Sequence, residues 1–279
     1  MRYSTYFVKG WKPVLFQIFA VVLGLFIISP IIYALFISVM PADQILSNPP
    51  KIIPRTVILD NYKKAIESTR LGRYMWNSLV IAGISSVVRL ITASMAAFAF
   101  SFFDFKGKSF LFTLTMGTVM IPGDVVLVTN YQTVAKLGLV NTYLGMMIIF
   151  MVSALNIFVM RQNFLSFSKE IKEASEVDGC SNLRFFATIL LPLNRPVLTT
   201  VFISAFIGTW NTYLWPMLVT NDDAMRTVQV GVTMLNFPDG TVYGPIMAAS
   251  ILVLLPVMVM FIIFRRQIVG GLMGGAIKG

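Results

Sequence analysis

The sequence predicts an all-α integral membrane protein with about six transmembrane helices. Of its 279 residues, 57% are hydrophobic and only 12% are charged, whereas a soluble domain carries about 25% charged residues. Such a chain cannot cover its surface with hydrated side chains. Its apolar residues are instead gathered in runs of about 18 residues or more, the length that a helix needs to cross about 30 Å of hydrocarbon.

Six segments of the sequence fit this description, and each is predicted to form a membrane-spanning helix. The second contains several serines and Arg89, and the third is interrupted near its end by Pro122, Gly123 and Asp124. The six predicted spans are Val14–Met40, Tyr74–Phe103, Ser109–Asn130, Tyr143–Met160, Val197–Val219 and Tyr243–Phe264.

The basic residues between the spans predict the orientation of the chain. If both termini lie on one side, that side holds most of the 22 lysine and arginine residues. Because basic residues are concentrated on the cytoplasmic side of membrane proteins, both termini are predicted to be cytoplasmic. Residues 1–13 then form a cytoplasmic N-terminal segment, 14–265 the membrane domain with a long inner connection at 161–196, and 266–279 a cytoplasmic tail.

Two longer connections are expected on the outer side of the membrane. The first, Pro41–Arg73, contains several prolines and then a helix-like stretch around Asn61–Ser68. The second, Asn221–Val242, is predicted to turn at residues that favour turns, which are Asn236, Pro238, Asp239 and Gly240.

Composition argues against nucleic-acid binding and against catalysis. The net charge is +10, but the basic residues lie between apolar runs, and no basic face of a soluble fold is visible. The chain has one cysteine, Cys180, and no histidine, so neither an intrachain disulfide nor a cysteine-based metal cluster can form. No paired carboxylates and no nucleophile beside a base stand out. We therefore expect no catalytic residue, no metal and no cofactor.

The inner connection carries the most informative pattern in the chain. Phe164, Phe167, Ile171 and Ala174 recur at helical spacing and predict one helical stripe. Asp178-Gly179 is a turn signal, because glycine can take the positive φ that ends a helix.

A second helix is expected after this turn. Ser181 can cap its start, and it is predicted to run to Leu191, until Pro192 and Pro196 break it before the fifth span. The connection therefore predicts a short helix-turn-helix on the cytoplasmic face.

This connection resembles the "EAA" signature of the permeases of ATP-binding-cassette (ABC) importers. One residue departs from the signature: Ser175 stands where alanine is usual, and serine is small enough to keep close packing. The matching positions are Glu173, Ala174, Ser175, then Gly179 after three residues, Ile189 after nine more, and Leu191-Pro192 after one.

The resemblance implies that the loop docks into a cleft on a cytoplasmic ATPase subunit and transmits its motion to the spans. In that arrangement Glu173 supplies a charged or hydrogen-bonding contact and Gly179 supplies the turn. Ala174 and Leu191 would pack against the ATPase.

Other stretches resemble the carbohydrate branch of these permeases, the maltose-type importers. Glycerol-phosphate importers share the same pattern, so the solute remains open. The stretches are Ile121-Pro122, Asn130-Tyr131, Leu137 through Gly145, Trp210-Asn211, Trp215-Pro216 and the glycine-rich tail that ends in Lys278-Gly279.

Four residues are candidates for the solute path. Arg89 lies within a span, where an ionised side chain is costly, so it is expected to face the bundle interior and pair with a carbonyl or a carboxylate. A structural role and a solute contact are both open for it. Trp210 and Tyr213 could contact solute or belong to an interfacial aromatic belt. Asn211 is expected to face protein or the path, because an amide is costly in lipid.

The chain is not expected to hydrolyse ATP. A phosphate-binding loop needs glycine five residues before Gly-Lys-Ser, and the Gly107-Lys108-Ser109 sequence has Phe102 there. The resemblance instead implies a pair of cytoplasmic ATPase subunits, a second and different permease subunit, and an extracytoplasmic solute-binding protein. The chain would be a multi-pass protein of the cytoplasmic membrane that imports a sugar or related polyol by alternating access.

Other classes of protein fit the sequence less well. A glycerol-phosphate importer permease is the alternative within the same branch. An ion-coupled secondary transporter would carry acidic residues within the membrane, and Asp124 is thin support for it. A membrane-embedded enzyme would need a catalytic cluster, and a purely structural scaffold would not need the hairpin signature.

Overall fold

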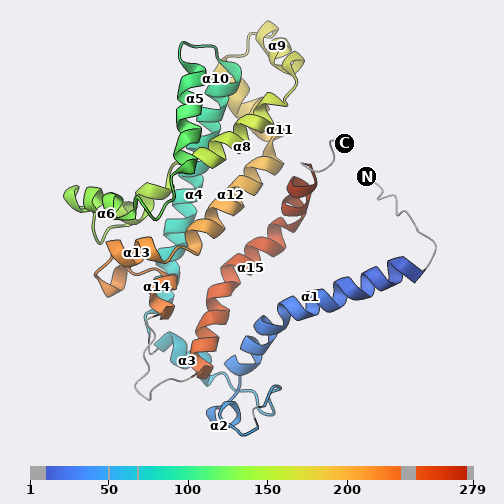
Figure 1. Cartoon of the computed structure of the whole chain (residues 1–279), viewed down its shortest axis with the longest axis vertical. Coiled ribbons are helices and arrows are strands. Elements are labelled where there is room, and N and C mark those ends of the chain that lie inside the picture. Colours follow the sequence, from blue (N-terminus) through green and yellow to red (C-terminus); the bar gives the residue numbers. More distant parts are fainter. Residues whose placement is uncertain (1–10, 50, 68, 234–242, 275–279) are drawn as a thin grey trace. The chain divides into compact units, whose positions relative to one another are not determined.

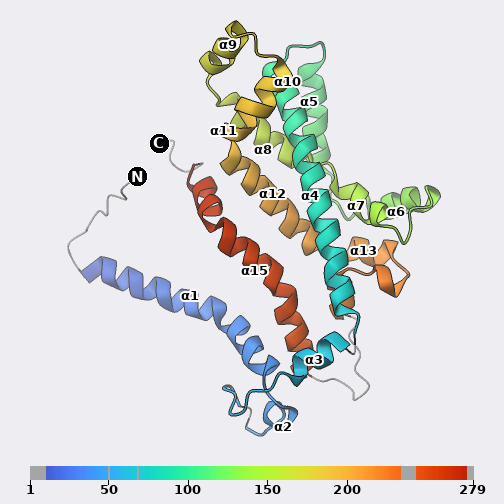
Figure 2. The ribbon, with the colours of Figure 1, turned by 180° about the vertical axis from the view of Figure 1, so that it is seen from behind.

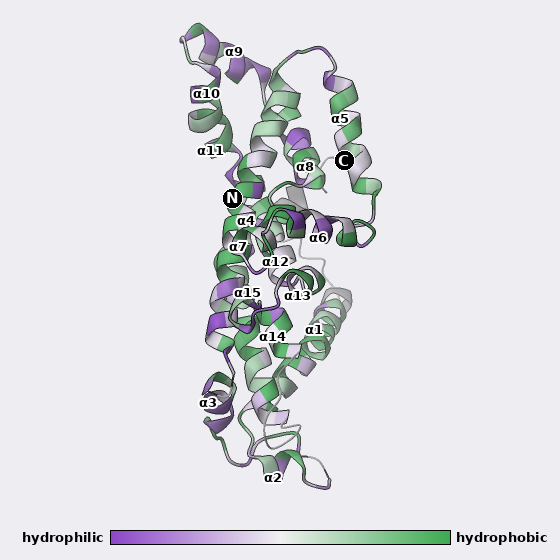
Figure 3. Ribbon diagram, turned by 90° about the vertical axis from the view of Figure 1, so that its left-hand side faces the viewer, coloured by the Kyte–Doolittle hydropathy of each residue, from purple (hydrophilic) through white to green (hydrophobic). Residues whose placement is uncertain are grey.

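The computed structural model describes residues 11–49, 51–67, 69–233 and 243–274. Every regular element in these ranges is a helix (Figure 1), which confirms the predicted all-α class. Hydrophobic residues dominate the long helices, whereas hydrophilic residues gather on short elements such as α3 (Asp60–Glu67) and α9 (Lys169–Val177) (Figure 3).

Parts of three predicted regions lie outside the described residues. They are most of the segment 1–13, the end of the tail 266–279, and the turn residues Asn236, Pro238, Asp239 and Gly240 of the last outer loop.

The chain divides into two compact units. The first unit contains residues 1–69 and 235–254, and the second contains residues 70–234 and 255–279. The helix α15 (Tyr243–Gly274) contributes residues to both.

In the first unit, α1 (Trp11–Ser38) exposes apolar side chains along most of its length, as expected of a helix surrounded by lipid. The short α2 (Ala42–Ile45) follows it. The buried amide of Asn61 on α3 donates hydrogen bonds to the carbonyl oxygens of Ser38 (3.0 Å) and Met40 (2.8 Å). One carbonyl belongs to the last residue of α1 and the other lies two residues beyond it, so neither has a helical donor. The helix predicted around Asn61–Ser68 is therefore present, and it satisfies the end of the first span.

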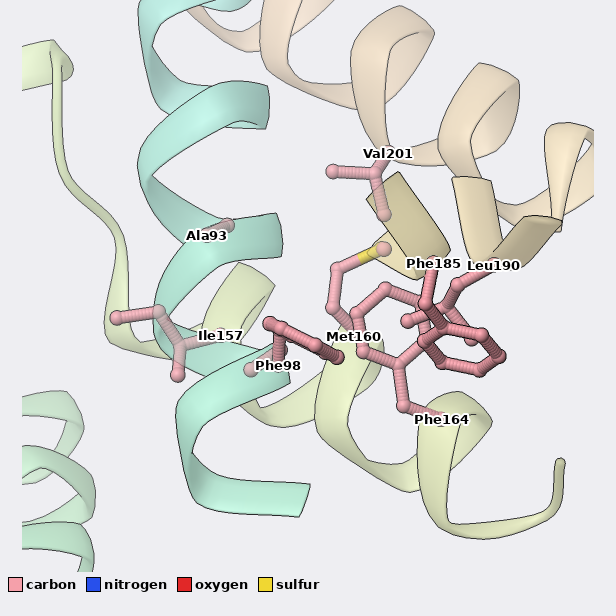
Figure 4. Close-up of a cluster of buried hydrophobic side chains, with 9 residues drawn as sticks. Ala93, Phe98, Ile157, Met160, Phe164, Phe185, Leu190 and Val201 are labelled. Atoms are coloured by element: carbon pink, nitrogen blue, oxygen red, sulfur yellow. The ribbon is translucent and has the colours of Figure 1, made fainter. Parts of the chain in front are cut away.

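In the second unit, the long helix α4 (Leu71–Phe102) packs along α8 (Ala154–Leu165) and α12 (Arg195–Trp210) (Figure 2). Small residues on α4, such as Ala93 and Ala97, are fully buried and allow this close approach. They belong to a cluster of buried apolar side chains (Figure 4), here called the inner cluster, formed by Ala93, Ala97, Phe98, Ile157, Met160, Phe164, Phe185, Leu190 and Val201.

Three of the described helices are by themselves long and apolar enough to cross a membrane, over Val14–Ser38, Leu71–Phe102 and Tyr243–Arg265. Two further spans are present only if bent pairs of helices are each taken as one span. The pair Tyr143–Phe150 and Ala154–Leu165 is bent by 47°, and the pair Asn182–Leu193 and Arg195–Trp210 by 81°. The structure therefore shows three to five spans, and six spans stay a prediction.

The predicted third span, Ser109–Asn130, is not one continuous helix. In its place are α5 (Lys108–Gly117), the single turn η1 (Thr118–Met120) and α6 (Leu127–Lys136). The chain leaves the helix just before Pro122, whose preceding residue is sterically disfavoured in the α conformation.

The predicted fifth span, Val197–Val219, is likewise not one continuous helix. The helix α12 stops at Trp210, and α13 (Leu214–Val219) begins after a break. The sequence stays apolar beyond this break because Trp215 and Val219 are buried in the core of the protein.

We expect Gly231→Ala to destabilise the second unit. Gly231 lies in α14 (Val228–Thr233), and a Cβ atom there would lie 2.1 Å from the Cδ2 atom of the Tyr74 ring on α4. Over-packing of this kind costs about 1–3 kcal/mol. A lower thermal midpoint in detergent, followed through the thiol of Cys180, checks this. Gly208→Ala is the control, since no atom lies within 4 Å of its Cβ position; equal midpoints for the two variants would contradict the packing argument.

Candidate functional site

The inner connection forms the predicted helix-turn-helix, here called the hairpin (residues 169–193). Its first helix, α9, ends before Gly179, which has φ = 71°. The Ser181 side chain accepts a hydrogen bond from the backbone N–H of Arg184 (3.4 Å) and caps α10 (Asn182–Phe185). The predicted turn and the predicted cap are both present.

Two details of the hairpin differ from the prediction. The stripe from Phe164 to Ala174 is divided between two helices, because the chain breaks at Ser166–Ser168 between α8 and α9. Pro192 does not end the second helix. The chain passes through a π-helical turn, η3 (Phe186–Leu190), and continues as α11 (Leu191–Leu193).

The π-helical turn gives a physical reason for this continuation. Proline lacks the N–H of a normal helical bond, and a widened turn just before it changes the hydrogen-bonding pattern that proline would interrupt. The helix ends instead at Asn194, whose side-chain amide donates to the carbonyl oxygen of Leu190 (2.8 Å) at the 81° bend.

Local contacts hold the two helices of the hairpin together. The N–H of Cys180 donates to the carbonyl oxygen of Ser175 (2.8 Å) across the turn. The ammonium group of Lys172 donates to Glu176 (2.6 Å) and to the side-chain oxygen of Asn182 (2.9 Å). The same group lies 4.9 Å from the centre of the Phe185 ring, a cation–π distance. Lys172 therefore connects α9 to α10.

The base of the hairpin is part of the inner cluster (Figure 4). The Phe185 side chain is fully buried, with its ring centre 5.7 Å from that of Phe102 and 6.4 Å from that of Phe98, both on α4. Ile189 and Leu191 are half-buried and pack against the same cluster. The base of the hairpin therefore packs directly against α4 and α8.

The tip of the hairpin is exposed and partly apolar. Val177 is 87% exposed and Leu183 is 75% exposed, and Glu173, Ala174 and Gly179 are exposed as well. Ser175 is buried, and its hydroxyl donates to the carbonyl oxygen of Lys172 (2.7 Å). The departure from the family signature therefore falls at a position that packs within the hairpin, where a small side chain is needed.

The four predicted solute-path residues are not gathered in one open site. Trp210 is 2% exposed and stacks on Phe206 at a ring-centre distance of 5.9 Å. Asn211 is exposed at the break after α12, and Tyr213 is half-buried. The Asn211 side-chain oxygen accepts a hydrogen bond from Gln229 (3.4 Å) on α14, a neighbour that no sequence pattern indicated.

The positions of Trp210 and Trp215 argue against a place in an interfacial aromatic belt. Both are buried, and the indole N–H of Trp215 donates to the carbonyl oxygen of Met146 (3.2 Å). A belt residue would instead present its ring to the membrane interface.

Arg89 is half-buried on α4, and its Nε donates to the carbonyl oxygen of Phe150 (2.5 Å). The guanidinium carbon lies 5.9 Å from the centre of the Phe150 ring. The predicted pairing of Arg89 with a carbonyl group is therefore present. No carboxylate lies within ion-pair distance of Arg89 in the part of the chain that the structure describes.

A polar network that the sequence did not reveal joins the start of α4 to the segment 219–228. The Asp223 carboxylate accepts from the Tyr74 hydroxyl (2.7 Å) and from Arg226 (2.9 Å), and it lies 3.4 Å from Nε of Arg70. The fully buried amide of Asn77 donates to the carbonyl oxygens of Ala224 (2.9 Å) and Arg226 (2.8 Å).

Asn77 also accepts a hydrogen bond from the Tyr143 hydroxyl (2.6 Å) on α7 (Tyr143–Met147). Its partners explain how an asparagine is tolerated inside an apolar span, because a buried amide is costly only when it is unpaired. The network links three segments that are far apart in the sequence.

Long apolar helices, bent pairs of helices and a polar hairpin packed on their core are the features of a polytopic membrane protein. The class is that of a transport permease. Residues 7–269 match the family model described as "Binding-protein-dependent transport system inner membrane component". The chain belongs to this family, so it is a multi-pass protein of the inner membrane, and the predicted membership among ABC importer permeases is confirmed.

Relatives of known name cover nearly the whole chain. The chain is 34% identical over 261 residues to the sn-glycerol-3-phosphate transport system permease protein UgpE of Brucella abortus (strain 2308), with 90% of this chain and 93% of the relative covered. It is 32% identical over 259 residues to the arabinooligosaccharides transport system permease protein AraQ of Halalkalibacterium halodurans, covering 90% and 91%.

Solved structures share the fold. A chain of a bacterial ABC transporter involved in the import of the acidic polysaccharide alginate superposes with a TM-score of 0.83 at 21% identity, covering 94% of this chain and 99% of that one. A chain of the bacterial alginate ABC transporter in complex with an alginate pentasaccharide-bound periplasmic protein gives a TM-score of 0.64 at 16% identity, covering 92% and 98%.

Proposed function

We propose that this chain is one permease subunit of an ABC importer and that it moves a sugar or related polyol across the inner membrane by alternating access. The observation that carries the proposal is the hairpin. It has an exposed, partly apolar tip and a base buried in the inner cluster. This is the arrangement expected of an element that receives motion from another subunit and passes it to the spans.

The proposed ATPase contacts follow from exposure. Glu173 and Ala174 are exposed on α9 and meet the ATPase directly, while Gly179 provides the turn and Ser175 packs inside the hairpin. Ile189, Leu191 and Pro192 are half-buried and lie at or near the base. For Leu191 we therefore favour a role in anchoring the hairpin over direct packing on the ATPase.

The proposed topology has six spans within residues 14–265, both termini in the cytoplasm, and the hairpin in the cytoplasmic connection 161–196. Residues 1–13 and 266–279 are the cytoplasmic segments. The basic-residue distribution supports this orientation. Pulse labelling of single-cysteine variants from either side of the membrane tests it, after Cys180 has been replaced.

The proposed partners are two ATPase subunits, a second permease subunit and an extracytoplasmic solute-binding protein. The family description names dependence on a binding protein, and one similar solved structure holds a periplasmic protein. The chain has no phosphate-binding loop of its own, so ATP hydrolysis is assigned to the ATPase subunits. In alternating access the transporter is open first to one side of the membrane and then to the other. Solute and ATP can shift the balance between these two states only by binding them with unequal affinity.

The solute class rests on the similar proteins, whose names include a glycerol phosphate and an oligosaccharide. A glycerol-phosphate importer is the second candidate because several similar permeases carry that name. Uptake assays with labelled oligosaccharides and with glycerol 3-phosphate separate the two. Loss of uptake on ATP depletion, with no loss on collapse of the ion gradient, distinguishes an ABC importer from a secondary transporter.

We expect Leu183→Asp to reduce recovery of the ATPase with the tagged chain by about tenfold or more, because burying a carboxylate in an apolar contact is costly. Leu183 is 75% exposed and makes little contact within the chain, so the fold should be retained. Affinity purification in mild detergent followed by mass spectrometry measures the recovery.

Leu137→Asp is the matched control, because Leu137 is 61% exposed and lies between the third and fourth proposed spans. With both termini in the cytoplasm, that connection is on the outer side. Its variant should retain the ATPase. Equal recovery with both variants would contradict docking at the hairpin tip.

A further inference from the structure

The candidate span formed by α7, the single turn η2 (Ile148–Phe150) and α8 is interrupted at residues 151–153, where its two parts meet at 47°. An interruption of this kind leaves backbone carbonyl groups at the end of η2 without the donor that a continuing helix would supply. Inside a membrane such groups must find another donor, because no bulk water is available.

Both donors come from one face of α4. Nε of Arg89 donates to the carbonyl oxygen of Phe150 (2.5 Å), and the hydroxyl of Thr92 donates to that of Met151 (2.9 Å). Residues three apart lie on the same side of a helix, so the pair matches two consecutive carbonyl groups. The Thr92 hydroxyl also lies 3.0 Å from the carbonyl oxygen of Arg89.

The other side of the interruption is closed as well. The Ser153 side chain accepts the N–H of Asn156 (3.4 Å) and caps the start of α8. The polar backbone groups on both sides of the interruption therefore have hydrogen-bond partners. Those before it are paired with side chains of α4, and one after it is paired with Ser153.

We propose that Arg89 and Thr92 are positioning residues that fix this interruption against α4 and set the point about which α8 pivots. The inference rests on the proposed function. The helix α8 carries Met160 and Phe164, which belong to the inner cluster, and the same cluster contains the base of the hairpin. A displacement of the hairpin moves the far end of α8, and the Arg89–Thr92 contacts hold its near end. Arg89 thereby acts on transport through the backbone of Phe150 and not through the solute.

The absence of a carboxylate near Arg89 in the described ranges supports a role as a hydrogen-bond donor. A donor of similar reach should therefore replace it, whereas an apolar side chain should not. For Thr92 the same logic separates serine, which keeps the hydroxyl, from valine, which keeps only the shape.

The experiment uses the complete complex, with its ATPase, second permease and binding protein, reconstituted in lipid nanodiscs and in vesicles. The variants are Arg89→Leu, Arg89→Lys, Thr92→Val and Thr92→Ser. Thr200→Val is the control, because the Thr200 hydroxyl bonds only to the carbonyl oxygen of Pro196 within its own helix (2.9 Å). The readouts are membrane amount, Vmax and KM of uptake, and ATP hydrolysis with and without loaded binding protein.

We expect Thr92→Val and Arg89→Leu to lower Vmax by about tenfold, the effect of leaving one part-buried carbonyl group unpaired. The KM for solute should stay within about twofold of the value for the original chain, because the lost hydrogen bond does not take part in solute binding. Binding protein should no longer stimulate ATP hydrolysis. Arg89→Lys and Thr92→Ser should restore most of the rate, and Thr200→Val should behave as the original chain.

A raised KM in Arg89→Leu with no effect of Thr92→Val would overturn the proposal and assign Arg89 to the solute. Normal transport by Thr92→Val would overturn it as well. Failure of the proposed function has a different signature, because no ATPase would then be recovered with the unmodified chain.

Discussion

Gly179→Pro is expected to abolish solute uptake while the chain remains in the membrane. Gly179 has φ = 71°, and proline is fixed near φ = −65°, so the turn between α9 and α10 cannot form around it. The substitution also removes the N–H that donates to the carbonyl oxygen of Glu176 (3.0 Å). Without the turn, α9 and α10 no longer present one surface to the ATPase. Uptake by intact cells, measured beside membrane amount, checks this.

Gly107→Pro provides the matched control. Gly107 also has a positive φ, 81°, and no atom lies within 4 Å of either Cβ position. The two substitutions therefore cause similar backbone strain, but only one disturbs the hairpin. Full uptake by Gly179→Pro, or equal loss in both variants, would remove the hairpin from the coupling pathway.

Phe185→Ala is expected to separate the hairpin from the spans without preventing ATPase docking. Phe185 belongs to the hairpin and is fully buried against α4, and truncation of a buried phenylalanine costs about 3–5 kcal/mol. The hairpin tip remains exposed and able to bind, but its base no longer transmits force to Phe98 and Phe102. ATPase recovery should be retained, and uptake should fall by about tenfold or more.

Leu193→Ala serves as its control, because Leu193 lies on the same continuous helical segment and is 60% exposed. It should leave both uptake and ATPase recovery unchanged. If Phe185→Ala loses the ATPase together with uptake, the base and the tip of the hairpin cannot be assigned separate roles.

Local signals in the sequence were sufficient to predict the hairpin. A glycine that can take positive φ and a serine that can cap the next helix are each recognised within a few residues of sequence. The Asn61 helix and the span of α4 were predictable for the same reason. Family resemblance then added the ATPase contacts, which no local pattern could indicate.

The features that were missed depend on contacts between distant segments. Pro192 was expected to end a helix, but the π-helical turn before it depends on how Phe186 and Leu190 pack in the inner cluster. For Trp210 the sequence left a solute contact and an aromatic belt open, because the packing that buries this residue depends on the whole fold. Gln229 beside Asn211, and Asp223 beside Tyr74, are separated by 18 and 149 residues, so only the fold brings them together.

The helix α4 has 32 residues and is therefore about 48 Å long, with a different attachment at each end. One end holds the segment that contains Asp223, through Tyr74 and Asn77, and the other holds the hairpin base, through Phe98 and Phe102. Suppose that a ligand bound near one end of α4 favours one position of this helix, and that a ligand at the other end favours the same position. Thermodynamic linkage then requires each ligand to raise the affinity for the other by the same factor. The factor by which a docked binding protein raises affinity for nucleotide must then equal the factor by which nucleotide raises affinity for the binding protein.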